Sequence, residues 1–191
     1  IALWKWFVEI SLKEYKRTYN QLGIEFDSYK GESFYTDKMP AQVEKLRESG
    51  LDEVIKKECA DGKPLLGICL GMQLLFERSF EYGEHEGLGL IKGSIRPISD
   101  VIDADLKIPH IGWNALHFGE NKDELFKYLS EGDFVYFVHS YYGADCAESV
   151  IATTEYSAEL TAAVRNKNVC GVQFHPEKSE KVGLSILKAF C

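Results

Sequence analysis

The sequence predicts an α/β fold, a three-layer sandwich with a mostly parallel central sheet. Two observations support this fold class. Short apolar runs bounded by turn-forming residues alternate with amphipathic helical stretches, and the apolar run at 64–68 leads directly into a helical segment. Of the 191 residues, 45% are hydrophobic and 27% are charged, which is typical of a globular domain and excludes a disordered chain or a coiled coil.

The helices are predicted from apolar side chains that recur on one face with Glu and Lys between them. The strands are predicted from short apolar runs bounded by Gly, Pro, Asp or Asn. Because the strands after residue 134 follow one another closely, part of the sheet is expected to be antiparallel. In chain order, the predicted elements are helix 3–21, strand 24–26, an irregular stretch to Pro40, helices 41–49 and 51–60, strand 64–68, helix 70–80, a strand pair within 87–98, strands 134–140, 149–154, 162–165 and 169–174, and helix 181–190.

Charge and length exclude two classes of partner. Lys plus Arg number 22 and Asp plus Glu number 30, so the formal net charge is −8, which argues against binding nucleic acid by phosphate neutralisation. No apolar run reaches the roughly 18–20 residues of a membrane span. The first residues lack the pattern of a secretory signal, and the chain begins at Ile1 and not at Met, so a fragment or a joined sequence is one interpretation.

The cysteines indicate a reducing compartment, and we expect a cytoplasmic location. Their odd number and the absence of a CxxC pair fit neither a disulfide framework nor a zinc site. No cluster has metal-ligand spacing and no phosphate loop is present, so no metal and no organic cofactor is expected. The five cysteines are Cys59, Cys69, Cys146, Cys170 and Cys191.

The stretch Gly67-Ile68-Cys69-Leu70-Gly71 is the most informative motif. It has the form Gly-x-nucleophile-x-Gly between a predicted strand and a predicted helix, which is the setting of a nucleophile elbow. Glycines on both sides would relieve crowding in so tight a turn. A helix N-terminus beside the sulfur would lower the thiol pKa and favour the thiolate. The alternative interpretation is a buried structural cysteine.

A thiol nucleophile needs a base, which is usually a histidine oriented by a carboxylate. His175 ends an apolar strand, and Glu177 follows two residues later, so Cys69, His175 and Glu177 form a candidate triad. His139 also ends an apolar strand but has no carboxylate nearby. We assign the segment around His139 to substrate binding through its backbone.

These motifs resemble a known family. Residues 67–73 (GICLGMQ) and 173–177 (QFHPE) are similar to the two signatures of class I glutamine amidotransferases. Residues 87–91, 108–114 and 136–142 resemble the glutaminase branch of that family that serves imidazole glycerol phosphate synthesis in histidine biosynthesis. The resemblance covers about residues 41–191, which predicts an amidotransferase domain there.

The resemblance implies a mechanism. Cys69 attacks the side-chain amide of glutamine to form a γ-glutamyl thioester, His175 acts as general base and acid, and Glu177 orients His175. The N–H of Leu70 matches one oxyanion-hole donor. Glutamate is released, and ammonia passes to a (β/α)8 cyclase that is expected as the heterodimer partner.

The family also implies roles for residues around the triad, which fall into two groups. One group binds the glutamine substrate and the other faces the partner. The substrate-binding residues are Gln73, Ser140 and Tyr141, and the partner-facing residues are Trp113, Asn114 and Lys178.

The first 40 residues depart from the family. Its Pro-Gly-Val-Gly oxyanion segment is replaced by about residues 34–37 (FYTD), and its opening strand is absent. Residues 1–40 instead resemble a fragment of the arginyl-tRNA synthetase catalytic domain, without the ATP-site signatures of that enzyme. The predicted domains are therefore an atypical segment at 1–40 and an amidotransferase domain at 41–191. Two alternatives remain: a catalytically impaired docking module, or an amidotransferase that feeds another acceptor such as a surface-sugar precursor.

Overall fold

The computed structural model describes residues 6, 9–10, 12–13, 16, 49–119 and 122–191, and the chain consists of two compact units, Ile1–Gly50 and Leu51–Cys191. In the first unit, all the described residues from 6 to 16 are helical, as expected for a helix at 3–21. The predicted strand at 24–26, the stretch to Pro40, residues 34–37 and nearly all of the helix at 41–49 lie outside the described residues.

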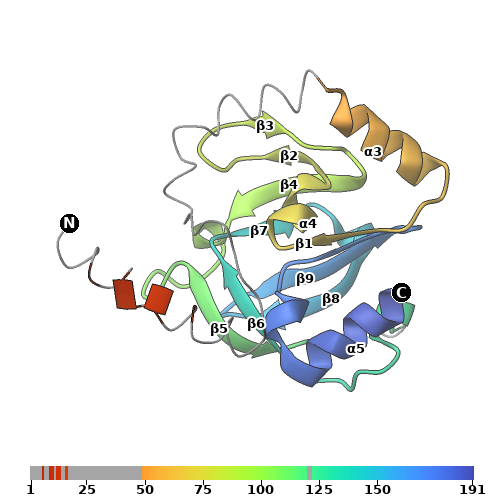
Figure 1. Cartoon of the computed structure of the whole chain (residues 1–191). Helices are drawn as coiled ribbons and strands as arrows, with labels where there is room; N and C mark the ends of the chain where they lie inside the picture. Colours follow the sequence, from red (N-terminus) through yellow and green to blue (C-terminus); the bar gives the residue numbers. More distant parts are fainter. Residues whose placement is uncertain (1–5, 7–8, 11, 14–15, 17–48, 120–121) are drawn as a thin grey trace. The chain divides into compact units, whose positions relative to one another are not determined.

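The second unit contains the strand that leads to Cys69. Strand β1 (Leu65–Ile68) pairs in parallel with β10 (Val169–Val172), and the sheet continues with antiparallel β9 (Glu159–Asn166) and β8 (Val150–Glu155) (Figure 1). Within the described residues, β1 lies at one edge of this sheet, and β10 is its neighbour. The apolar run at 64–68 is therefore a strand, as predicted.

Two further sheets complete the strand content of the described residues. Strand β2 (Phe76–Ser79) lies between β3 (His85–Glu86) and β4 (Ile91–Pro97), and β7 (Tyr141–Ala144) pairs with β4. Strands β5 (His110–Ala115) and β6 (Phe134–His139) form an antiparallel two-stranded ribbon. The ribbon leaves the second edge of β6 available for other contacts, and the candidate site is built there.

Helices of the second unit lie in two separate hydrophobic layers. Helix α5 (Glu180–Phe190) buries Ile186 with Phe174 and the residues of β6, β9 and β10 that face it. Helices α3 (Leu51–Ala60) and α4 (Leu70–Leu74) bury Cys59 and Met72 in a second cluster with the β2–β4 sheet (Figure 1). The sheet around β10 therefore lies between two apolar layers, which agrees with the predicted sandwich. The short 3-10 helices are η2 (Ile98–Asp100), η3 (Glu124–Phe126), η4 (Ala147–Ser149) and η5 (Pro176–Lys178).

The α/β class is confirmed, but the strand pairing is mixed and not mostly parallel among the described residues. Only the β1–β10 and β2–β4 pairs are parallel there. Strands β8, β9 and β10 follow one another through short connections, and a short connection can join only antiparallel strands. The expectation of antiparallel strands in the later half of the chain is thus correct.

Two predicted elements are wrong. The helix expected at 70–80 ends at Leu74, because Phe76 is fully buried and begins β2, which pairs with β3 and β4. The expected strand pair within 87–98 is a single strand, β4. The N–H groups of Gly87, Leu88 and Leu90 instead donate to the carbonyls of Glu77, Leu74 and Leu75, so this stretch is tied to the end of α4 and to β2.

Candidate active site

Cys69 lies in a strained turn between β1 and α4. Its backbone has φ 51° and ψ −108°, a conformation that non-glycine residues adopt rarely. The N–H of Cys69 donates to the carbonyl of Val172 at 2.8 Å, and the N–H of Gln73 donates to the carbonyl of Cys69 at 3.2 Å. These bonds hold the turn from both sides, so the predicted nucleophile elbow is present.

The two glycines of the motif differ in their structural roles. A Cβ atom on Gly67 would lie 2.5 Å from the carbonyl oxygen of Gly71 and 2.8 Å from the backbone nitrogen of Met72. A Cβ atom on Gly71 would meet nothing within 4 Å, apart from the backbone of its own helix. The close approach of α4 to β1 therefore requires glycine at position 67 and not at position 71.

The thiol of Cys69 is partly buried, and its ionisation departs from expectation. Burial raises the pKa of the Cys69 thiol, and the negative charge of Glu177 acts in the same direction. The N–H of Leu70, the charge of Lys178 and the amide of Gln173 oppose this shift without reversing it. The pKa of the Cys69 thiol is therefore raised and not lowered as predicted, because burial outweighs the hydrogen bond from the Leu70 N–H at the start of α4.

His175 and Glu177 form the expected pair. The Nδ1 atom of His175 lies 2.7 Å from Oε1 of Glu177, which fixes the ring and leaves Nε2 for proton transfer. The side chain of Ser179 supports the same turn: its Oγ donates to the carbonyl of His175 at 2.7 Å and accepts the N–H of Tyr136 at 2.9 Å. Ser179 is fully buried, so both bonds are shielded from water.

Both Cys69 and His175 are attached to the free edge of β6. The thiol of Cys69 donates to the carbonyl of Val138 with a sulfur–oxygen distance of 3.9 Å, and the N–H of His175 donates to the carbonyl of Tyr136 at 2.9 Å. Carbonyls two residues apart on a strand point the same way and lie about 7 Å apart along it. The strand therefore brings Cys69 and His175, which are far apart in sequence, to neighbouring positions on one edge, as the predicted pairing of nucleophile and base requires.

Gln73 lies beside this pair and is almost buried. Its Nε2 donates to Oε1 of Gln173 at 3.0 Å and is 3.4 Å from the carbonyl oxygen of Tyr141. Both hydrogens of the Gln73 amide are thus used, and its Oε1 is left to accept a hydrogen bond. The segment around Tyr141 contacts Gln73 through its backbone carbonyl, and its binding of substrate stays a prediction.

His139 is a structural residue in this geometry. Its Nδ1 lies 2.8 Å from the carbonyl oxygen of Tyr141, and its Nε2 lies 3.0 Å from Nδ1 of His110. Burial lowers the pKa of His139 to about 4 and also lowers the pKa of His110. A buried, neutral His139 with both nitrogens occupied is not free to act as the base.

The remaining predicted residues lie around the β5–β6 ribbon. Trp113 is 45% exposed and stacks edge-on against Tyr136, with ring centroids 6.0 Å apart. Asn114 Oδ1 lies 2.8 Å from Nε2 of His110, and Lys178 Nζ lies 5.9 Å from the ring centre of Tyr136. The carbonyl of Ser140 accepts the N–H of Ile98 at 3.0 Å, so Ser140 is held in the turn before β7.

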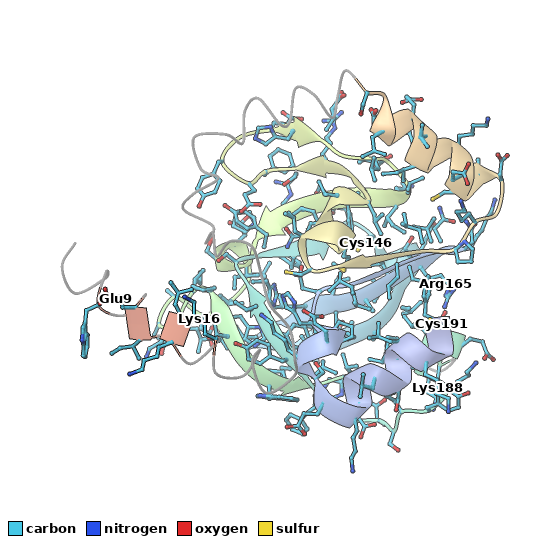
Figure 2. All side chains as sticks on the ribbon, viewed as in Figure 1. Glu9, Lys16, Cys146, Arg165, Lys188 and Cys191 are labelled. Atoms are coloured by element: carbon cyan, nitrogen blue, oxygen red, sulfur yellow. The ribbon has the colours of Figure 1, made fainter. Side chains whose placement is uncertain are left out.

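The other cysteines lie away from the triad. Cys59, Cys146 and Cys170 are buried and Cys191 is exposed, and all five thiols are free. Figure 2 shows Cys146 in the interior of the strands and Cys191 at the end of α5. Burial raises the pKa of Cys59, Cys146 and Cys170, as expected for inert core thiols.

Three groups that contact Cys69 or His175 were not predicted from the sequence: the Gln173 amide, the Val138 carbonyl and the Ser179 hydroxyl. The sequence does contain a signal for Gln173, because a polar residue that directly follows a fully apolar strand is a candidate for a buried polar side chain. The Val138 carbonyl and the Ser179 hydroxyl depend on tertiary contacts, and no local pattern indicates them.

Comparison with known proteins agrees with this geometry. Residues 40–191 match the family model for glutamine amidotransferase class-I, so the chain belongs to that family. Residues 1–62 match the model for the catalytic domain of class I tRNA synthetases (R), which overlaps the first match and agrees with the resemblance of the first 40 residues.

Individual relatives show which members of the family this chain is similar to. The chain is 48% identical over 149 residues to imidazole glycerol phosphate synthase subunit HisH of Aquifex aeolicus, covering 78% of this chain and 70% of that protein. It is 50% identical over 150 residues to the subunit of the same name from Sulfurimonas denitrificans, covering 78% of this chain and 72% of that protein.

Solved structures support the fold alone. A crystal structure of a glutamine amidotransferase has a TM-score of 0.56 and 20% identity, covering 93% of both chains. The structure of PurLQS from Thermotoga maritima has a TM-score of 0.55 and 20% identity, covering 73% of this chain and 66% of that chain. The predicted fold family is therefore confirmed.

Proposed function

We propose that this chain is a glutaminase that hydrolyses glutamine to glutamate and ammonia and delivers the ammonia to a (β/α)8 cyclase for imidazole glycerol phosphate synthesis. The observation that carries the proposal is the attachment of Cys69 and His175 to neighbouring carbonyls on one edge of β6. The relatives named HisH support the choice of pathway. We also propose that the amidotransferase domain begins near residue 41.

The proposed reaction has two halves. In the first, His175 removes the thiol proton, Cys69 Sγ bonds to the carboxamide carbon of glutamine, and the oxygen of the tetrahedral intermediate accepts from the Leu70 N–H. The intermediate collapses when His175 returns the proton to the nitrogen, so ammonia leaves and a thioester remains. Glu177 holds the His175 ring during both transfers.

In the second half, water attacks the thioester. His175 takes a proton from the water, the carbon–sulfur bond breaks, and glutamate leaves with the new oxygen in its carboxylate. The proton then returns to the sulfur of Cys69. Gln73 is positioned for substrate binding, since its Oε1 is free to accept a hydrogen bond from the amino-acid end of glutamine.

One face of the β5–β6 ribbon provides a surface for the cyclase. Ile111, Trp113 and Phe134 are 58%, 45% and 55% exposed. The strand register places Trp113 opposite Tyr136 and Ile111 opposite Val138, so these apolar side chains share one face. Because Tyr136 and Val138 also hold the catalytic residues, a partner seated on this face would lie next to the source of ammonia. Lys178 flanks the same face, with its Nζ over the Tyr136 ring. Asn114 points to the opposite face of the ribbon, where it contacts His110 and Glu155, and its contact with the cyclase stays a prediction.

The test of turnover is glutamate release by the purified chain, measured with and without the cyclase subunit of an imidazole glycerol phosphate synthase. We expect release that depends on Cys69, so Cys69→Ala abolishes it. The matched control is Cys59→Ala, which removes a buried thiol on α3 and leaves the site intact. No release from a folded chain that binds the cyclase would favour the docking-module alternative, and release without cyclase binding would favour another acceptor.

The test of docking compares two substitutions that each replace an exposed aliphatic side chain by aspartate. Ile111→Asp introduces a charge into the ribbon face, whereas Leu184→Asp introduces one on the exposed side of α5, where Leu184 is 63% exposed. We expect the first to weaken cyclase binding at least tenfold and the second to leave it unchanged, as measured by titration calorimetry. Equal effects of both substitutions would contradict the proposed surface.

We propose a cytoplasmic location from the state of the cysteines. All five cysteines are free, which suits a reducing cytoplasm. Among the helices in the part of the chain that the structure describes, none has the length and apolar character needed to cross a membrane.

A further inference from the structure

A fully buried glutamine lies beside the nucleophile, and the proposed mechanism gives it no role. Gln173 follows β10 and has no exposed surface. Its N–H donates to the carbonyl of Ala162 at 2.8 Å, which fixes its backbone. Its side-chain amide contacts Gln73 on one side and the sulfur of Cys69 on the other. Burying a primary amide is costly unless its polar atoms are paired, and here both are paired within the site.

The direction of the hydrogen bonds in this group is set by a backbone carbonyl. The oxygen of Tyr141 can only accept, so the Nε2 end of Gln73 must face it. The second hydrogen of that Nε2 then goes to Oε1 of Gln173, at 3.0 Å. The remaining end of Gln173, its Nε2, therefore faces Cys69 Sγ, at 3.7 Å. His139 holds the Tyr141 carbonyl from the other side, at 2.8 Å, which strengthens the anchor.

The sulfur thus has one acceptor, the carbonyl of Val138, and two donors, the backbone N–H of Leu70 and the side-chain N–H of Gln173. The thiol can donate to the carbonyl of Val138, at 3.9 Å, but the thiolate loses that bond because it has no proton. The N–H of Gln173 points to the sulfur in both states, and hydrogen bonds to a charged partner are stronger than those between neutral groups. The hydrogen bond from Gln173 therefore stabilises the Cys69 thiolate, whereas burial of the sulfur destabilises it.

We propose that Gln173 is a positioning residue that stabilises the thiolate formed when Cys69 loses its proton, with its amide oriented by Gln73 and the Tyr141 carbonyl. The proposal deepens the proposed function and rests on it for the role of Cys69 as nucleophile. Its effect is exerted through the sulfur, so it is measurable on the thiol without turnover of glutamine.

The test is the pH dependence of Cys69 alkylation by iodoacetamide, followed by mass spectrometry of the peptide that contains Cys69. The variant is Gln173→Met, which keeps a similar length and removes both polar atoms. We expect the midpoint of the alkylation profile to rise by about one pH unit, which is about a tenfold loss of rate below the midpoint. The exposed Cys191 provides an internal reference that should not shift.

The matched control is Thr154→Val. Thr154 is also fully buried and loses one hydrogen bond, that to the carbonyl of Ala115, but it does not contact the sulfur. A purely structural role for Gln173 would lower the melting temperature in both variants and leave both alkylation midpoints unchanged, which would overturn the proposal. A midpoint that rises only in Gln173→Met supports it.

A second variant keeps the test decisive if Gln173→Met does not fold. Gln173→Glu has nearly the same shape and replaces the donor with an acidic group that, once ionised, repels the thiolate, so we expect a midpoint at least as high as for methionine. An unchanged midpoint in this variant would also overturn the proposal. Failure of the unmodified chain to release glutamate would contradict the proposed function, whereas the alkylation midpoints would still decide the role of Gln173.

Discussion

Replacing Gly67 by alanine would place a methyl group inside the turn that carries Cys69. The new Cβ atom would lie 2.5 Å from Gly71 O, 2.6 Å from Gly71 C and 2.8 Å from Met72 N. All three are backbone atoms of α4, so no side chain can rotate away. The contact reaches an ordinary 3.4 Å only if α4 moves from β1 by about 1 Å.

The expected effect has two parts. Overpacking of this kind typically costs 1–3 kcal/mol, and the rigid neighbours place Gly67→Ala near the upper end, at about 3 kcal/mol of unfolding free energy. A displacement of about 1 Å at a catalytic group costs about 100-fold in rate. We therefore expect both a less stable chain and a loss of glutamate release that exceeds the loss of folded protein.

The assay combines urea unfolding with glutamate release per folded molecule. The matched control is Gly71→Ala, because its Cβ atom would have no neighbour within 4 Å outside its own helix, and alanine has the higher helix propensity. We expect the control to be as stable as the unmodified chain or slightly more so. Unchanged stability and activity in Gly67→Ala would refute the close approach of α4 to β1.

Three further predictions concern the surroundings of the base. Glu177→Gln removes the carboxylate that lies 2.7 Å from His175 Nδ1. We expect kcat for glutamate release to fall by at least about 100-fold, with the melting temperature little changed. An unaffected kcat would exclude Glu177 as the group that orients His175. Ser179→Ala leaves the Tyr136 N–H without its acceptor and should lower the free energy of unfolding in urea by about 1–3 kcal/mol. The control, Ser185→Ala on α5, loses one hydrogen bond to the carbonyl of Lys181 and should change that free energy by less than about 0.5 kcal/mol. Equal losses in the two variants would contradict the role of Ser179. Burial lowers the pKa of His139 to about 4 in the folded chain, whereas the unfolded chain binds this proton near pH 6.5. The contribution of neutral His139 to stability is therefore fully present above pH 6.5 and is lost as the pH falls towards 4. The loss is about 3 kcal/mol at most, and His139→Gln should flatten the urea-unfolding profile over this range if the burial of His139 is its cause.

The candidate triad could be predicted because its parts lie within short motifs. The glycines around Cys69 and the carboxylate two residues after His175 are local features with a local physical reason. The length of α4 could not be predicted in this way. Residues 70–80 have a helical pattern, but burial of Phe76 and pairing of β2 with β4 override it.

The ionisation of Cys69 was also beyond local prediction. A turn into a helix predicts a lowered thiol pKa, but the degree of burial and the charge of Glu177 depend on strands distant in sequence. The amide of Gln173 belongs to the same class of feature. Its residue type is visible in the sequence, whereas its contact with the sulfur exists only because β1 and β10 lie side by side.

The register of those two strands determines whether the two motifs form one site. Four residue pairs define it, from Leu65 opposite Val169 to Ile68 opposite Val172, and the bond from Cys69 N–H to the Val172 carbonyl extends it by one step. A slip of one residue would move Cys69 by about 3.3 Å relative to His175 and turn the side chains of β1 to the opposite face. Since Gln173 and His175 both lie within three residues of the end of β10, the same slip would separate the sulfur from its amide donor and from the predicted base. The site is therefore most sensitive to changes that weaken this short parallel pairing, even where they touch no catalytic side chain.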